Sequence, residues 1–486
     1  MYMIHRILIF LAACVFPLGL SCTSAFLVKP QGFYSMHYLR PQDDFITRCE
    51  QPQFFSTTLS YHHSSNSKEI ARALFGSSTL RFVGSDLPQE PGDLLADNFG
   101  LASNFLGTMS FAPNIQTVTL DLFYHLTLSN LCEKLFIEFS APLVFTRWDL
   151  NACEKITQRG STVFPGCEMS NTPATPVPTA STIAQALSGS FLFGNMEEPW
   201  YNGRFVFKSQ DTTRLADFTI ALGYNFYQSE LFRLSACILS IMPTGNHFKP
   251  TKVFHPVIGN GSHWELGASL TANAHYSWDE ANSIDAYLIG TFTHPFDNRQ
   301  RRSFDFIGQG PLSRYMLLEQ VKVVSVDNVN TLTYNGALMN AINFNTRCVE
   351  VDCGVEGDLV AKLSYARKHC LLEGGYTLYG RTQEHIHLPC TKIPDDVTGE
   401  LYTMKGASLC NPFIPVPLLT SNDLDLSSAE IPSSIVHTLF LQGGYQWTGR
   451  SGEYAMLMGI SETVGSYGCY HALNEWSIWT QFRLRF

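Results

Sequence analysis

The chain has 486 residues and a net charge of −10 at pH 7, with only 15% charged and 13% aromatic residues. A soluble domain usually carries about 25% charged residues, and a bundle of membrane helices would be far more apolar than the observed mean hydropathy of zero. An acidic chain also lacks the clustered Lys and Arg that nucleic-acid binding requires. The composition favours strands that are apolar on one side only, and it predicts no nucleic-acid partner.

The N-terminus has the pattern of a secretory signal peptide. Arg6 precedes an apolar run over residues 7–20, and Thr23, Ser24 and Ala25 offer a small-residue cleavage site. This pattern predicts a signal peptide at residues 1–25. An alternative is lipidation at Cys14, because residues 11–14 match a lipobox. We expect residues 26–52 to form a periplasmic segment, so that a barrel occupies residues 53–486 of the exported protein.

The rest of the chain is marked by segments in which apolar and polar residues alternate with a period of two, as amphipathic strands do. We expect strands at residues 54–62, 117–128, 135–145, 216–226, 232–242, 264–276, 284–292, 355–365, 372–378, 435–447, 454–460 and 473–486. A short helix is expected near residues 68–75.

The connections between these segments alternate in length. Short turns are expected at 129–134, 228–230, 279–282, 367–369 and 448–452, and the long loops fall at 63–114, 148–213, 296–350 and 383–434, with smaller ones at 243–262 and 465–472. A soluble β-sandwich also alternates, but its turns need not fall into two length classes. The pattern therefore predicts an all-β fold, a transmembrane antiparallel up-and-down β-barrel of about 12 strands (10–14 possible), with short periplasmic turns and long extracellular loops.

The last segment ends in an alternating run, with Phe482, Leu484 and Phe486 on its apolar face. It resembles the closing strand of bacterial outer-membrane β-barrels, in which this run is the assembly signal. The resemblance implies a bacterial outer-membrane location, with outer-membrane lipids, periplasmic chaperones and the barrel assembly machinery as partners. A stretch with Pro243-Thr244-Gly245 and Trp264-Glu265-Leu266-Gly267 is similar to the outer-membrane family linked to phenol degradation, which implies transport of small solutes.

The polar strand faces predict which charged residues line the lumen. These candidates are Asp121, Glu138, Asp217, Arg233, Glu265, Asp285, Glu356, Asp358, Lys362, Glu373, Arg381, Arg483 and Arg485. Rings of such charges can tune the selectivity of a pore, or they can form a salt-bridge network that fills a narrow barrel. The sequence leaves both interpretations open.

Removing Cys14 and Cys22 with the signal leaves eleven of the thirteen cysteines, and export permits disulfides. Cys153 and Cys167 share one predicted loop and Cys390 and Cys410 share another, so each pair is a possible disulfide. His385 and His387 precede Cys390, but this spacing is too unspecific to predict a metal site. We therefore predict no metal and no cofactor.

Neither a G-x-S-x-G elbow nor an H-E-x-x-H motif occurs in the chain, so the sequence predicts no catalytic residue and no enzyme. The expected function is an outer-membrane channel or transporter for small solutes. The alternative is a surface structural or adhesion protein that acts through its long loops.

Overall fold

The computed structural model describes residues 39, 53–170, 175–279, 281–326, 329–389, 401–405, 417–450, 452–465 and 472–486. The predicted signal peptide lies outside these residues. Among the described residues, no helix combines the length and the apolar character needed to cross a membrane.

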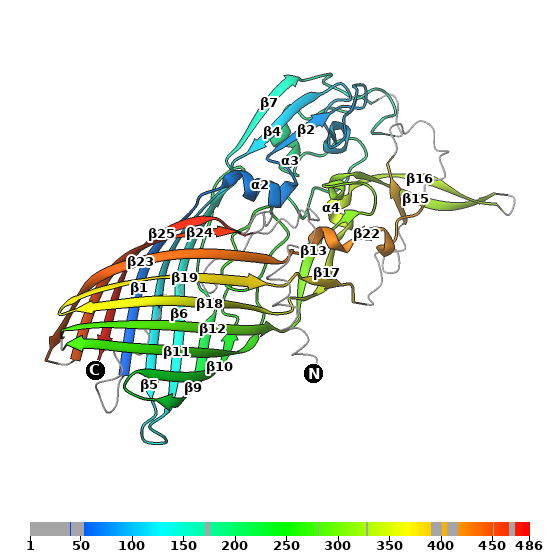
Figure 1. Cartoon of the computed structure of the whole chain (residues 1–486). Helices are drawn as coiled ribbons and strands as arrows, with labels where there is room; N and C mark the ends of the chain where they lie inside the picture. The colour runs from blue at the N-terminus through cyan, green and yellow to red at the C-terminus, as the bar shows by residue number, and fades with distance from the viewer. Residues whose placement is uncertain are drawn as a thin grey trace.

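The dominant feature is a closed barrel of 12 antiparallel strands, which confirms the predicted fold class (Figure 1). The sides of the membrane on which its turns and loops lie stay a prediction. Each predicted strand is present. In chain order, the barrel consists of β1 (Gln53–Ser64), β5 (Asn114–Thr127), β6 (Leu135–Asp149), β9 (Phe218–Gln228), β10 (Phe232–Met242), β11 (Glu265–Asp279), β12 (Asn282–Pro295), β18 (Glu356–Arg367), β19 (Cys370–Arg381), β23 (Ser434–Gly449), β24 (Gly452–Gly465) and β25 (Glu475–Arg485).

Closure of the barrel depends on the pairing of the first strand with the last. β1 pairs with β25 in one unbroken register, from Phe54 opposite Arg485 to Ser64 opposite Glu475. On its other side β1 pairs with β5, again without a bulge. Each of the 12 barrel strands thus has two hydrogen-bonded neighbours. A sheet that spans a bilayer must close in this way, because lipid offers no hydrogen bonds to an unpaired strand edge.

The outer surface of the barrel wall is apolar, whereas its inner surface is largely polar. On β11, Leu266 and Leu270 are half exposed to the outside, whereas Glu265 is buried. The same alternation holds on β25, where Ile478 is exposed and Gln481 is buried. Apolar side chains on the outside of a closed barrel form a surface suited to lipid.

One barrel end carries the five tight turns, and we call it the short-turn end. At the opposite end, which we call the mouth, the long connections pack together into a second body, the cap. The cap comprises the described parts of residues 65–113, 150–209, 243–264, 296–355 and 382–433, and it lies beyond the mouth in Figure 1.

The cap contains short helices, short strands and one longer hairpin, formed by β15 and β16. Its elements are α2 (Ser67–Phe75), β2 (Thr79–Val83), β3 (Leu94–Leu95), η3 (Ala96–Phe99), β4 (Leu106–Phe111), β7 (Ala152–Gln158), α3 (Ile183–Leu187), β13 (Asn298–Ser303), β14 (Asp305–Phe306), η4 (Ser313–Tyr315), β15 (Leu317–Val326), β16 (Val329–Asn340), α4 (Ala341–Phe344), β17 (Thr346–Asp352), β20 (His385–His387), β21 (Leu401–Met404), η5 (Ser421–Asp423), β22 (Leu424–Asp425) and η6 (Leu426–Ala429). Helix α2 confirms the short helix expected near residues 68–75. β8 (Gln210–Leu215) extends the barrel wall by pairing with the half of β6 nearest the mouth.

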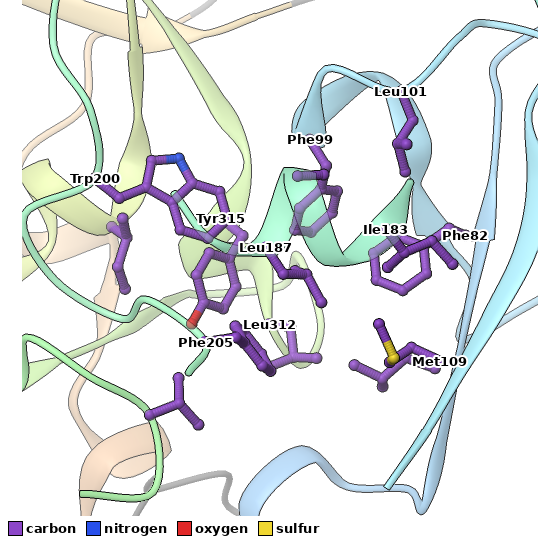
Figure 2. Close-up of a cluster of buried hydrophobic side chains, with 14 of the residues drawn as sticks. Phe82, Phe99, Leu101, Met109, Ile183, Leu187, Trp200, Phe205, Leu312 and Tyr315 are labelled. Carbon is purple, nitrogen blue, oxygen red and sulfur yellow. The ribbon is translucent and has the colours of Figure 1, made fainter. Parts of the chain in front are cut away.

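An apolar core holds the cap together. Figure 2 shows side chains from separate connections converging, among them Phe82, Met109, Ile183, Trp200 and Tyr315. Trp148 at the end of β6 belongs to the same cluster, so barrel and cap share one core. The long loops therefore pack against one another in one folded structure.

Candidate functional site

The inner face of the barrel collects the charged residues that the alternation predicts to lie there. Ten of the predicted lining residues are buried: Asp217, Arg233, Glu265, Asp285, Glu356, Asp358, Lys362, Glu373, Arg483 and Arg485. Asp121, Glu138 and Arg381 are partly exposed. Their position on the inner face follows from the strand register, whereas a role in selectivity stays a prediction.

Glu373 and Arg483 form a buried ion pair in the lumen wall. Two parallel hydrogen bonds of 2.7 and 2.8 Å join the guanidinium of Arg483 to the two carboxylate oxygens of Glu373. The side-chain amide of Gln442 also donates to Glu373, and Arg483 Nε donates to Gln481 at 2.8 Å. Bidentate pairs of this kind fix geometry as well as charge, so this network locks β19, β23 and β25 together.

An apolar ring lies beside this network. It consists of Leu39, Tyr287, Ile289, Val360, Phe440 and Trp479, all of them buried. Leu39 comes from the segment predicted to be periplasmic and is the one residue of 26–52 that the structure describes. Its carbonyl accepts a 2.8 Å hydrogen bond from Gln481, so Leu39 lies inside the barrel. The periplasmic assignment of residues 26–52 stays a prediction.

A polar cluster occupies the mouth, between barrel and cap. Asp217, between β8 and β9, accepts hydrogen bonds from the backbone amides of Asn260 and Gly245. The Asn260 side chain donates to Glu265 at 2.8 Å, and Tyr379 donates to Glu356 at 2.5 Å. Three carboxyl groups thus meet at the junction of barrel and cap.

Burial dominates the electrostatics of the mouth. It raises the pKa of Asp217 to about 7, against the backbone hydrogen bonds that lower it, and the charge of Glu356 raises it further. Gly259 lies so close that a Cβ there would be 2.6 Å from the Asp217 carboxylate, and its φ of +87° also favours glycine. Asp217 is therefore held tightly by the loop that follows β10.

Cys353 and His263 form a second contact near the mouth, with Sγ 3.5 Å from Nε2. Burial raises the pKa of the Cys353 thiol and lowers the pKa of His263. Both groups are then neutral at pH 7, and a neutral thiol is a poor nucleophile. This contact does not provide an activated Cys–His pair.

One predicted disulfide is wrong. Cys167 is disulfide-bonded, whereas Cys153 is free with its side chain exposed, so these two residues do not pair. Cys153 lies on β7, where backbone pairing with β4 fixes its position. The other possible pair, Cys390 and Cys410, lies outside the described residues.

The histidines near Cys390 do not form a metal site with other described residues. His385 and His387 lie at the two ends of β20, both exposed, with Ile386 buried between them. In the part of the chain that the structure describes, no three His, Cys, Asp or Glu side chains are grouped as metal ligands.

Sequence reasoning missed the buried charges of the cap. Arg314 donates to Asp305 at 2.8 Å and Arg302 donates to Glu384 at 3.3 Å, in loops for which no period-two pattern exists. Leu39 was missed as well, because nothing in its local sequence marks it as a contact of the lumen. By contrast, Thr244 and Gly245, which lie next to Asp217 at the mouth, belong to the stretch that carries the similarity to the phenol-degradation family.

The sequence matches no protein-family model and no curated protein. Among solved structures, an outer-membrane channel from Pseudomonas putida F1 is similar with a TM-score of 0.37 and 12% identity, over 92% of this chain and 99% of that chain. A FadL homologue from Pseudomonas aeruginosa gives a TM-score of 0.27 and 8% identity, over 90% of this chain and 89% of that chain.

The monoaromatic hydrocarbon channel CymD gives a TM-score of 0.28 and 10% identity, over 96% of this chain and 94% of that chain. Strand closure, register and the apolar outer face define the class: the chain has the fold of an outer-membrane β-barrel.

Proposed function

We propose that the protein is a channel or transporter for small solutes in a bacterial outer membrane. The observation that carries this proposal is a closed 12-strand barrel with a polar, charged inner face and an apolar outer face. Eight-stranded barrels are filled by side chains and barrels of sixteen strands leave an open channel, so twelve strands enclose an intermediate lumen. The proposal assigns no catalytic step and no cofactor.

The test is reconstitution of the refolded protein in planar bilayers, with stable conductance steps as the expected result. A matched pair of variants links any conductance to the lumen. Ile289 is buried in the apolar ring, whereas Leu288 beside it faces outward and is half exposed. We expect Ile289→Trp to lower the conductance and Leu288→Trp to leave it unchanged. A silent membrane, or equal effects of the two variants, would contradict a lumenal pathway.

The alternative is a surface structural role exerted by the cap. The cap has a second apolar cluster of its own, which includes Phe304, Val349 and Ile386, and its hairpin β15–β16 projects away from the barrel (Figure 1). A persistently silent membrane, together with an intact barrel on heat-modifiable gels, would favour this second role.

A further inference from the structure

One row of polar side chains crosses four neighbouring barrel strands. Arg233 on β10 lies opposite Asn273 on β11, which lies opposite Tyr287 on β12, which in turn lies opposite Lys362 on β18. All four are buried on the inner face. Side chains at directly opposite positions on one face of an antiparallel sheet are neighbours. The register therefore gathers four side chains with hydrogen-bond donors on one side of the lumen.

Three of these side chains have a polar atom without a hydrogen-bond partner among the residues that the structure describes. The atoms are Lys362 Nζ, the Tyr287 hydroxyl and Asn273 Nδ2. The exposed fractions of the three residues are only 2%, 3% and 6%, so bulk water does not solvate them. A desolvated ammonium without a hydrogen bond is unfavourable, and Lys362 is compensated in part by the Tyr287 ring, whose centroid is 4.7 Å from Nζ.

The carboxylates of the adjoining row do not supply the missing acceptors. In that row Asp285 lies opposite Ser364, and Ser364 lies opposite Glu373. His275 contacts the Asp285 carboxylate at 2.7 Å, and Arg483 and Gln442 bind that of Glu373. Lys362 acts electrostatically on Glu373, yet Arg483 already balances the charge of that carboxylate. Glu373, Arg483 and Lys362 together therefore carry one net positive charge.

The donors adjoin the apolar ring, and Tyr287 belongs to both. From this geometry we propose that the lumen binds a small organic anion, with its carboxylate on Lys362, Tyr287 and Asn273 and its aryl or alkyl part against Ile289, Val360 and Trp479. The site deepens the proposed function, because a solute reaches it through the lumen. A carboxylate supplies the hydrogen-bond acceptors that these donors are missing. The aryl or alkyl part of the same anion would contact the adjoining apolar side chains.

The test measures binding to the full mature chain, refolded in a neutral detergent, by isothermal titration calorimetry. The probes are 4-phenylbutyrate and its neutral analogue 4-phenylbutyramide. Because hydrogen bonds to charged groups are the stronger ones, we expect the carboxylate to bind at least about tenfold more tightly than the amide. Lys362→Met should abolish this preference, whereas Lys134→Met, at an exposed turn, should preserve it.

Tyr287→Phe keeps the ring and removes only the hydroxyl, and we expect it to weaken binding of the carboxylate by a few-fold. This second variant keeps the test valid if Lys362→Met fails to fold. Absence of binding, equal affinity for the two probes, or an unchanged preference in both variants would overturn the site. Because the measurement needs no membrane, a failure here is distinguishable from a failure to conduct.

Discussion

Glu373 and Arg483 show what the inner face of this barrel requires of single residues. Both side chains are almost completely removed from solvent, at 0% and 1% exposure. A buried pair of this kind contributes little compared with a well-packed apolar pair, but losing one partner is costly, because the other charge is left unpaired.

We therefore expect Glu373→Gln to lower the free energy of unfolding by about 3 kcal/mol, because it leaves the Arg483 guanidinium buried without a counter-charge. Denaturant unfolding of the refolded barrel measures the change. The matched control is Glu453→Gln. Its partner Arg485 is 3.2 Å away, but the Glu453 side chain is 39% exposed, so the loss should stay below about 1 kcal/mol. Equal losses in the two variants would contradict the special role of the buried pair.

The sequence could predict the side of the wall on which these residues lie, but not their partners. A period of two places Glu373 and Arg483 on polar faces from local sequence alone. Their pairing depends on the registers of β19, β23, β24 and β25 relative to one another, which local alternation does not encode. The same holds for the row from Arg233 to Lys362, which exists only once four registers are fixed.

At the scale of elements, the strands were predictable because each barrel strand repeats a two-residue pattern over many positions. The pairing of β1 with β25, which closes the barrel, runs through eleven matched positions. Nine of the twelve predicted strands are shorter than the observed ones, since strand ends leave the lipid-facing zone and lose their alternation. The predictions for β9 and β10 have the observed length, and the one for β25 is longer than the strand. The assembly signal at Phe482, Leu484 and Phe486 stays a prediction, as do the assembly machinery and chaperones as partners.

A charge on the outer face should be costly in proportion to its depth in the membrane. Leu270 lies near the middle of β11 and faces outward, with 61% of its surface exposed. We expect Leu270→Arg to lower the free energy of unfolding in lipid by about 2 to 4 kcal/mol, as for arginine near a bilayer midplane. Folding titrations in lipid vesicles measure this change.

The matched control is Leu231→Arg, in the turn between β9 and β10, where Leu231 is 54% exposed. There the cost should fall to about 0 to 1 kcal/mol, because arginine near the interface reaches water. A result in which both variants are equally tolerated would contradict a lipid-facing surface on β11.

At the scale of the whole molecule, the cap is the part that the sequence did not reveal. Apart from the hairpin of β15 and β16, its strands have only two to seven residues, and its core joins residues as distant as Phe82 and Tyr315. Such contacts leave no periodic trace, so the long connections read as loops. The wrong pairing of Cys153 with Cys167 has the same origin, because proximity in one loop does not imply proximity in space, and the pairing of β4 with β7 fixes the position of Cys153.

The junction of barrel and cap should make the stability of the molecule depend on pH through Asp217. An ordinary aspartate has a pKa of about 4 in an unfolded chain, whereas the pKa of Asp217 in the folded protein is about 7. Between these two values the folded state keeps a proton that the unfolded state has lost. The free energy of unfolding should therefore fall as the pH rises from about 4 to about 7, by at most about 4 kcal/mol from this group, and then level off.

Asp217→Asn removes this titration. Its single side-chain oxygen accepts from only one of the two backbone amides, because Gly245 and Asn260 donate to different carboxylate oxygens, so we also expect a loss of stability that does not depend on pH. The measurement is the difference in unfolding free energy between the variant and the native chain across that pH range. Glu265 and Glu356 interact electrostatically with Asp217, so the difference between the two proteins reports Asp217 together with its coupling to these two carboxyl groups. Asp279→Asn, at an exposed turn at the opposite end of the barrel, should leave the decline in place. A decline that survives Asp217→Asn unchanged would show that this carboxyl is ionised in the folded protein, and that the loop after β10 holds it without a buried proton.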